Sequence, residues 1–291
     1  MLIQNLLKFS KNVICCIRLH TGVFDMSKFT NTVTFITGAS SGIGAALAME
    51  VARAGGDVAL VARRGKRLEE IARKIKAMGR QALVIPCDVT REDDIKSAAT
   101  KTMDKFGRID YVVANAGFGV GGRLEKLTVL DYRRQFDTNV FGALNTVYAT
   151  RESLIASHGC LAIVGSINGF VATPRLSAYV MSKFALHGLA ESLWHEFRPQ
   201  GIAVTLIAPG YVQTEIRQVD KWGVHHPEMK DRVPAWMQIS CEDAARQIAQ
   251  AMYRRKREKI ITMHGKVFVF IQRHFPGLMA RLVSWMSRKG L

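Results

Sequence analysis

The chain has 291 residues, which is enough for one large domain or two small ones. Hydrophobic residues make up 48% and charged residues 22%, and this composition excludes a disordered, fibrous or multi-span membrane protein. Charge is the unusual quantity, because 41 Lys and Arg against 24 Asp and Glu give a formal net charge of +17. Such an excess indicates an anionic partner, whether a nucleic acid, a membrane surface or an anionic ligand.

Residues 1–26 form an N-terminal extension that is basic and apolar. Lys8, Lys11 and Arg18 face one acid, Asp25, and the segment lacks the continuous apolar run and cleavage site of a secretory signal. A mitochondrial-type presequence is one hypothesis, and a physiological start at Met26 is the other. The composition leaves both open.

The cysteines favour a reducing compartment and no structural metal. There are five of them, an odd number, and none of their spacings suits a zinc site. We therefore expect a cytoplasmic protein without disulfides.

From residue 32 onward, short β-branched runs alternate with longer helical patterns, which is typical of βαβ units and a parallel sheet. The predicted strands span residues 32–37, 58–62, 82–86, 109–114, 160–165, 203–208 and 259–263. The predicted helices span residues 43–54, 66–78, 91–106, 131–156, 178–197 and 242–255. Because no linker or repeat interrupts the series, we predict a single Rossmann-type α/β domain over residues 27–264, with a doubly wound parallel seven-stranded sheet.

About half of the excess charge lies at the C-terminal end, where residues 253–291 carry ten basic residues and one acid, Glu258. The apolar run 267–271 is far shorter than the roughly 20 residues of a membrane-spanning helix. Beyond Gly277, six apolar residues share one arc of a helix: Leu278, Met279, Leu282, Val283, Trp285 and Met286. Residues 265–291 are therefore predicted to form a basic amphipathic C-terminal extension.

Three surfaces compete as the docking site of this extension. Its apolar arc suits the protein's own core or a partner subunit, and its basic character suits peripheral contact with an anionic membrane. Nucleic acid is disfavoured, because no aromatic-basic interleaving or known binding motif accompanies the charge. The pattern leaves open whether the extension docks on the protein itself or a partner subunit, or on a membrane surface.

A glycine-rich segment, TGASSGIG at residues 37–44, follows the first predicted strand and opens the first predicted helix. Glycines there permit a tight turn and let the backbone approach a pyrophosphate over the positive end of the helix. This context of strand, glycine-rich turn and helix predicts a dinucleotide site.

The same segment is similar to the cofactor loop of the short-chain dehydrogenase/reductase family. Further motifs follow in that family's order: Asp88-Val89, Asn115-Ala116-Gly117, Asn139, Ser166, Tyr179-x-x-x-Lys183 and Pro209-Gly210. The resemblance covers residues 30–264. Any one of these motifs can occur by chance, but all of them in this order make the resemblance specific.

The resemblance implies a set of cofactor-binding residues. Asp88 and Val89 would contact the adenine, Asn115 the adenosine side, and Thr214 the nicotinamide carboxamide. The remaining expected contacts are Gly38, Ser40, Ser41, Gly42, Ile43 and Gly44 in the glycine-rich loop, Arg63 and Arg64 after the second strand, and Tyr179 and Lys183 on the helix of residues 178–197.

The end of the second strand argues for NADP(H) rather than NAD(H). Ala62 stands where an acid commonly binds the ribose 2′-hydroxyl of NAD, and Arg63 and Arg64 follow it. Arginine meets a phosphate in bidentate fashion, as a 2′-phosphate requires. The alternative is that both arginines are solvated loop residues.

Tyr179 and Lys183 lie four residues apart on a predicted helix and therefore share a face. A nearby ammonium favours the phenolate, so we expect Lys183 to lower the pKa of Tyr179. The resemblance implies that Tyr179 exchanges a proton with the substrate oxygen, that Lys183 also holds the nicotinamide ribose, and that Ser166 positions that oxygen. It implies that Asn139 anchors a water behind the lysine. Ordinary structural roles as a half-buried ring, a solvated charge, a turn and a cap are the alternatives.

Four histidines, His187, His195, His225 and His226, have no acid or cysteine partner at ligand spacing. We therefore expect them on a helix surface or in a lid, and we expect no metal site.

The predicted function is hydride transfer between NADP(H) and a carbonyl or secondary alcohol. Residues 211–239 would form a lid whose apolar members favour a bulky substrate such as a steroid, a retinoid, another lipid or a 3-oxoacyl compound: Trp222, Val224, Pro227, Met229, Trp236 and Met237. The resemblance implies a homodimer or homotetramer. The rival hypotheses are an NADP(H)-binding sensor or scaffold without turnover, and a nucleic-acid-binding protein with charge spread over its body.

Overall fold

The seven β-branched runs form seven strands, which pair in parallel into one sheet of order β3-β2-β1-β4-β5-β6-β7. The strands are β1 Val33–Thr37, β2 Asp57–Ala62, β3 Ala82–Pro86, β4 Tyr111–Ala114, β5 Cys160–Val164, β6 Ala203–Ala208 and β7 Glu258–Ile260. This computed structural model describes residues 28–220, 222, 224, 226, 228 and 233–288, so the predicted extension at residues 1–26 lies outside the described residues. The predicted doubly wound sheet is confirmed.

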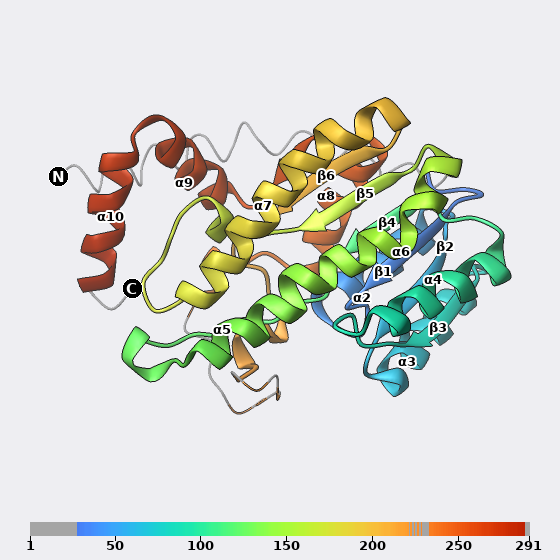
Figure 1. Ribbon diagram of the computed structural model, residues 1–291, viewed down its shortest axis with the longest axis horizontal. Coiled ribbons are helices and arrows are strands. Elements are labelled where there is room, and N and C mark those ends of the chain that lie inside the picture. The colour runs from blue at the N-terminus through green and yellow to red at the C-terminus, as the bar shows by residue number, and fades with distance from the viewer. Residues whose placement is uncertain are drawn as a thin grey trace.

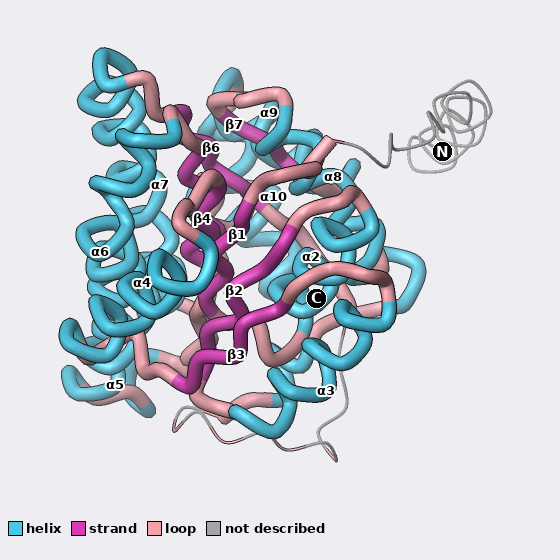
Figure 2. Tube along the Cα trace, turned by 90° about the vertical axis from the view of Figure 1, so that its right-hand side faces the viewer, coloured by secondary structure: helices cyan, strands magenta, loops and turns pink. Residues whose placement is uncertain are grey.

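Helices cover both faces of the sheet, because the inner strands β1, β4, β5 and β6 are buried on both sides (Figures 1 and 2). The helices are α2 Gly42–Arg53, α3 Gly65–Ala77, α4 Glu92–Phe106, α5 Val129–Phe136, α6 Gly142–Ser157, α7 Ser177–Phe197, α8 Cys241–Tyr253, α9 Met263–His274 and α10 Pro276–Arg288. One core cluster joins α2, α3 and α8 to the sheet, and the other joins α4, α6 and α7 to the opposite face. The chain therefore has the three-layer architecture of a Rossmann-type fold.

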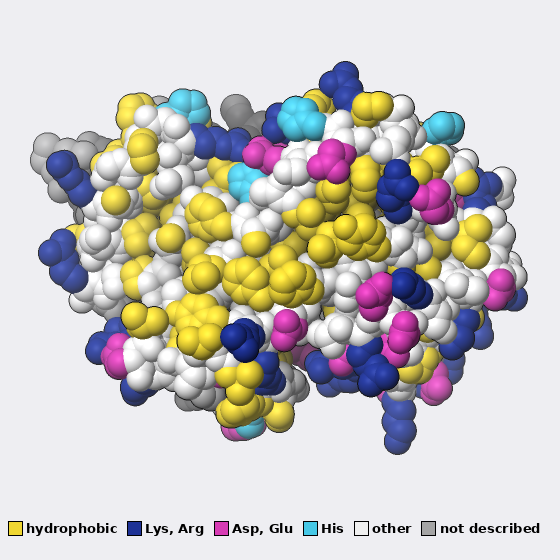
Figure 3. Space-filling model, in the orientation of Figure 1, with side chains coloured by type: hydrophobic (Ala, Val, Ile, Leu, Met, Phe, Trp, Pro, Cys, Tyr) yellow, Lys and Arg dark blue, Asp and Glu magenta, His cyan; other side chains and the backbone are white. Residues whose placement is uncertain are grey.

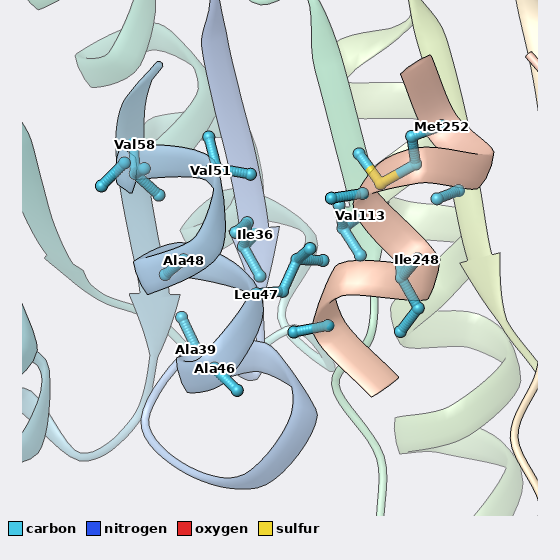
Figure 4. Packing of buried hydrophobic residues seen from close by; sticks show 14 of the residues in the cluster. Ile36, Ala39, Ala46, Leu47, Ala48, Val51, Val58, Val113, Ile248 and Met252 are labelled. Atoms are coloured by element: carbon cyan, nitrogen blue, oxygen red, sulfur yellow. The ribbon is translucent and has the colours of Figure 1, made fainter. Parts of the chain in front are cut away.

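The packing of α2 against α8 fixes the first of these layers (Figure 4). Leu47 of α2 is fully buried among Ile36 of β1, Val113 of β4 and Ile248 of α8. This helix follows the glycine-rich segment directly, so its packing also sets where the segment stands relative to the strand ends.

The helix predicted over residues 131–156 is confirmed in extent, but it is not one regular α-helix. The structure has α5, then a π-helical turn at Asp137–Phe141, then α6. Such a turn inserts one extra residue into the helix and is frequent at functional sites. It contains Asn139, which is 1% exposed, so the irregular turn directs this side chain into the protein.

The C-terminal residues form two helices beyond the carboxyl ends of the strands (Figure 1). Val269 of α9 and Met279 of α10 are each 1% exposed and join the core cluster on the side of α7. Of the arc predicted to be apolar, Leu282 and Val283 pack against that core, whereas Leu278 and Trp285 are exposed. The last predicted strand is shorter than expected, because β7 ends at Ile260 and α9 begins at Met263. No helix among the described residues is both long and apolar enough to cross a bilayer.

We predict that Leu47→Ala lowers the free energy of unfolding by about 2–5 kcal/mol, because it leaves a cavity between α2, α8 and the sheet. Urea unfolding followed by circular dichroism measures this change. The matched control is Leu124→Ala, since Leu124 is 72% exposed and its truncation should cost less than about 0.5 kcal/mol. Equal losses in the two variants would contradict the packing described here.

Candidate active site

The glycine-rich loop crosses the carboxyl ends of β1 and β4, where the strand order reverses direction. This switch point is where open α/β sheets bind ligands. Gly38 adopts a positive φ of 66°, and a Cβ on it would lie 2.8 Å from the Ala116 Cα. A Cβ on Gly44 would lie 2.6 Å from Asn115 Nδ2 and would also collide with the carbonyl oxygen of Gly38. The loop backbone at Gly38 and Gly44 therefore lies closer to residues 115 and 116 than a Cβ at either position would allow.

Thr37 and Asn115 fasten this loop to β4. Asn115 Nδ2 donates to the carbonyl oxygens of Thr37 at 2.9 Å and Gly38 at 3.3 Å. In return, Thr37 Oγ1 accepts the backbone N–H of Asn115 at 3.0 Å and donates to the carbonyl oxygen of Val113 at 3.2 Å. Asn115 thus positions the loop through hydrogen bonds at the adenosine side of the predicted site.

The loop leads into the N-terminus of α2, whose first turn carries unpaired backbone N–H groups and the positive end of the helix dipole. Ser41 is the N-cap residue, yet its side chain makes no capping hydrogen bond. Instead, Ser41 Oγ accepts from Arg64 Nη2 at 2.6 Å, and Ser40 Oγ accepts from Arg64 Nε at 3.1 Å. The predicted loop serines and Arg64 therefore form one cluster at the end of β2.

Glu215, in the segment predicted to form a lid, completes this cluster. Its carboxylate pairs with Arg64 at 3.1 Å and with Arg67 of α3 at 2.6 Å. Partial burial opposes ionisation of Glu215, but the hydrogen bonds and charges of Arg67 and Arg64 hold its pKa below the ordinary value. The two arginines thus already bind a carboxylate, which shows that they can hold an anion.

Arg63 points to a different pocket from Arg64. It lines a cavity of about 460 Å³ together with Asp88, Phe118 and Trp222. Trp222 is 4.8 Å from the guanidinium of Arg134 on α5, and its carbonyl oxygen accepts from Arg134 at 3.0 Å. The lid therefore contacts α5 across the predicted adenine region.

Val89, Ile43 and Thr214 lie near the carboxyl ends of the strands but in different surroundings. Val89 is 6% exposed, and its carbonyl oxygen accepts from Asn145 Nδ2 at 3.0 Å. Ile43 packs against the core from the first turn of α2. Thr214 lines a second cavity, of about 490 Å³, and its Cγ2 would lie 3.3 Å from a Cβ on Gly42. The residues predicted from separate motifs therefore lie at the same end of the sheet.

Ser166 and Tyr179 come together at the end of β5. Ser166 follows the strand and is 9% exposed, and Tyr179 of α7 lies close enough for the Ser166 hydroxyl to influence its pKa. Burial raises the pKa of Tyr179 above its ordinary value of 10.0, and the Ser166 hydroxyl and the charge of Arg217 offset part of this rise. The phenol is therefore protonated at neutral pH, with a neighbouring hydroxyl beside it.

Lys183 lies on the same face of α7, with its ammonium 5.6 Å from the centroid of the Tyr179 ring. It is 5% exposed and donates to the carbonyl oxygen of Val164 at 2.9 Å. Burial lowers the pKa of Lys183 from 10.5 to about 8. The expected net lowering of the pKa of Tyr179 is wrong for the protein alone, because burial raises it by more than the neighbouring groups lower it.

Asn139 reaches this group through Ser182. Its Nδ2 donates to Ser182 Oγ at 3.1 Å, and Ser182 Oγ donates to the carbonyl oxygen of Tyr179 at 2.7 Å. Asn139 also accepts from the N–H of Phe118 at 3.1 Å and donates to the carbonyl oxygen of Phe118 at 3.1 Å. It therefore ties the π-helical turn to α7 and to the segment that follows β4.

These features fit a dinucleotide on three counts. The loop has no room for a Cβ at Gly44, α2 points its dipole end at the crevice, and Arg64 stands over the two serines. The protonated Tyr179 and the buried ammonium of Lys183 lie at the end of β5, where Lys183 donates to Val164. A long cofactor therefore has binding groups along its length and an acid at its end.

The sequence did not predict a role in the site for four residues, namely Thr37, Arg67, Ser182 and Glu215. Thr37 belongs to the glycine-rich motif, and Ser182 directly precedes Lys183, so their places in motifs could have drawn attention to them. Arg67 lies one helical turn beyond Arg63 and Arg64. Glu215 joins Arg64 across 151 residues of chain, and no local pattern announces that contact.

The histidines considered as metal or catalytic candidates have other partners or lie outside the described residues. His187 hydrogen-bonds the carbonyl oxygen of Gly169 at 3.0 Å, and His226 lies 3.0 Å from Asp220 and from Glu228. His195 stands edge-on to Trp194, and His225 lies outside the described residues. Within the described part of the chain, no group of three or more His, Cys, Asp or Glu is placed to hold a metal ion.

Comparison with known proteins gives a consistent result. A family model described as short chain dehydrogenase matches residues 32–222. The 11-beta-hydroxysteroid dehydrogenase A of Sesamum indicum is 35% identical over 235 residues, which are 77% of this chain and 66% of that protein.

Two solved structures share most of the fold. The alcohol dehydrogenase of the archaeon Thermococcus sibiricus, complexed with 5-hydroxy-NADP, is 29% identical with a TM-score of 0.71, over 79% of this chain and 96% of the other. A short chain dehydrogenase from Mycobacterium paratuberculosis, bound to NAD, is 25% identical with a TM-score of 0.71, over 81% and 97%. Similar chains thus bind either nicotinamide cofactor.

We predict that Gly44→Ala raises the dissociation constant for the nicotinamide cofactor by ~10- to 100-fold, because the new Cβ forces the loop away from Asn115. Titration of cofactor fluorescence measures this change. Gly277→Ala is the control, since nothing lies within 4 Å of a Cβ at that position and binding should be unchanged. Normal binding by Gly44→Ala would contradict the close approach.

Proposed function

Because the chain belongs to the short-chain dehydrogenase/reductase family, we propose that it transfers hydride between NADP(H) and a carbonyl or secondary alcohol. The observation that carries the proposal is the grouping of Ser166, Tyr179 and Lys183 at the carboxyl end of β5, with the Lys183 ammonium 5.6 Å from the Tyr179 ring and the Ser166 hydroxyl near enough to lower the pKa of the phenol. Arranged in this way, a phenol, a hydroxyl and an ammonium can hold and protonate a reacting oxygen.

In carbonyl reduction, Tyr179 is the general acid. Its raised pKa keeps the phenol protonated at neutral pH, so a proton is present for an oxygen that gains negative charge. Ser166 orients the same oxygen by a second hydrogen bond. The nicotinamide, when bound, supplies or accepts the hydride at the substrate carbon.

Lys183 acts behind this pair. With a pKa of about 8 it is mostly an ammonium at pH 7, and its positive charge stabilises the phenolate that forms as Tyr179 releases its proton. Its position on the face of α7 shared with Tyr179 also suits a hydrogen bond to the nicotinamide ribose. Asn139 holds α7 in register through Ser182, and in this proposal it also anchors the water behind the lysine.

The preference for NADP(H) over NAD(H) rests on Arg64. It donates to both loop serines and already binds the carboxylate of Glu215, so the geometry suits a 2′-phosphate. Ala62 at the end of β2 supplies no acid for a 2′-hydroxyl. Arg63, at the pocket shared with Asp88, would add charge on the adenine side.

The substrate class is a bulky apolar carbonyl or alcohol. The described lid residues Trp222, Val224 and Trp236 are 57%, 53% and 83% exposed, so they offer apolar surface beside the crevice. Pro227 and Met229 lie outside the described residues. The steroid named for the Sesamum indicum relative is of the expected kind.

The homodimer or homotetramer expected from the family has a matching surface. Phe141 and Tyr148 on the side of α6, with Met181 and Phe184 of α7, are 43–69% exposed. Figure 3 shows a yellow band of hydrophobic side chains across this face. A second copy related by a twofold axis would cover the band with the same band.

We predict that Tyr179→Phe lowers kcat by at least about 100-fold while cofactor binding is retained, because the acid is lost and the ring is kept. The rate of NADPH oxidation with a panel of ketosteroids, retinal, 3-oxoacyl thioesters and small diketones measures kcat. Tyr253→Phe is the control, since that side chain is 46% exposed at the end of α8. Undiminished turnover by Tyr179→Phe would overturn the mechanism, and absence of turnover in the wild type would favour a sensor.

We predict that Arg64→Ala weakens NADPH binding by about 10- to 100-fold and leaves NADH binding nearly unchanged, because only NADPH carries the 2′-phosphate. Fluorescence titrations with both cofactors measure the ratio, and Arg73→Ala on exposed α3 surface is the control. The double substitution Ala62→Asp with Arg63→Ala should invert the preference in kcat/KM. An unchanged ratio in both experiments would defeat the assignment of NADP(H).

A further inference from the structure

The pair of helices α9 and α10 presents an exposed apolar face that the proposed hydride transfer does not use. Val267 and Phe270 of α9 are 48% and 56% exposed, and Phe275 between the helices is 56% exposed. Leu278 and Trp285 of α10 are 56% and 42% exposed. We call this surface the C-terminal face. Soluble chains seldom expose so many large apolar side chains on neighbouring turns, and such patches mark interaction sites.

The C-terminal face is apolar on the outside even though the helices are packed on the inside. Val269 and Met279 anchor α9 and α10 to the core and are each 1% exposed. The protein's own core is therefore already satisfied by the opposite side of each helix. The exposed side chains of Phe270, Phe275 and Leu278 can therefore contact a further surface.

The charge of this region identifies the partner's chemistry. Residues 263–291 contain no Asp or Glu, and the exposed Lys266, Arg281 and Arg288 pair with no acid among the described residues. Burial lowers the pKa of nearby Lys259, and the positive charges of Lys266, Lys256 and Arg254 lower it further. Positive charge thus accumulates here without compensation, which complements an anionic surface.

We propose that the C-terminal face docks on the surface of an anionic lipid bilayer, with Phe270, Phe275 and Leu278 at the boundary between headgroups and acyl chains. Lys266, Arg281 and Arg288 then lie at the level of the lipid phosphates. A bilayer surface suits this mixture, because it offers apolar depth and anionic charge within a few ångströms of each other. In Figure 3, hydrophobic and dark blue side chains lie together at the left, over α9 and α10.

Docking through this face brings the crevice toward the bilayer. A Cβ on Gly265 of α9 would lie 2.8 Å from Ile167, the residue after Ser166. His264 stacks on Tyr211 at the base of the lid, with ring centroids 5.1 Å apart. If the substrate is apolar, as the proposed function holds, it can pass from the lipid to the crevice over a short path.

The test is co-sedimentation of the full chain with vesicles of phosphatidylcholine alone and with phosphatidylserine added. We expect binding only to the anionic vesicles, and weaker binding as salt rises. The triple variant Lys266→Glu, Arg281→Glu and Arg288→Glu should reduce the partition coefficient by at least about 100-fold. Its matched control is Lys74→Glu, Lys76→Glu and Lys105→Glu, which changes the net charge equally on exposed parts of α3 and α4.

A second variant set tests the apolar contribution. Phe270→Ser, Phe275→Ser and Leu278→Ser together should lower binding by about tenfold or more. Leu124→Ser, Val129→Ser and Leu130→Ser remove three side chains that are 57–72% exposed elsewhere and should bind as the wild type does.

Three outcomes would overturn the proposal. The first is a wild-type chain that stays in the supernatant with anionic vesicles, and the second is a loss of binding in the control at Lys74, Lys76 and Lys105 as large as in the triple Glu variant of the C-terminal face. The third is a shift to a smaller species when sedimentation equilibrium is measured on the triple Ser variant of the C-terminal face, which would make this face an interface between copies. Turnover of a water-soluble carbonyl without vesicles should be unchanged in both triple variants of the C-terminal face, so failure of this test and failure of the proposed function are distinguishable.

Discussion

The hydrogen bonds between Asn115 and the carbonyl oxygens of Thr37 and Gly38 are the constraint on which the rest of the site depends. They join the carboxyl ends of β1 and β4, the two strands between which the sheet changes direction. Because they hold the loop against β4, residue 44 has to be glycine, and α2 begins at a fixed place. Packing of α2 against α8 then keeps the dipole end of the helix directed at the crevice.

Burial controls the acid-base groups, because a buried side chain is costly to charge. Tyr179 and Lys183 both titrate away from their ordinary values in the direction that favours the neutral form. The fold tolerates this because Val164 accepts a hydrogen bond from the ammonium and the Ser166 hydroxyl offsets part of the rise in the pKa of the phenol. A proton held in such a site is transferred to a developing oxyanion more readily than to water.

Local sequence was enough to predict the strands, most helices and the residues around the crevice. β-branched runs announce buried parallel strands, and glycines that no side chain could replace announce the loop. The irregularity within the helix of residues 131–156 was not predicted, because a π-helical turn adds one residue without changing the apolar pattern visibly. The direction of the pKa shift of Tyr179 was not predicted, because burial depends on the assembled fold. The role of Glu215 was not predicted, because its partners are distant in the chain.

The ion pairs of Glu215 have a consequence for the order of events at the site. The same carboxylate holds Arg64 and Arg67, and it belongs to the segment that follows β6. An anion that arrives at Arg64 must share or replace this carboxylate, so its affinity is reduced by the pairing that is lost. Because linkage is reciprocal, anything that weakens the hold of Glu215 on Arg64 strengthens the binding of the anion by the same factor.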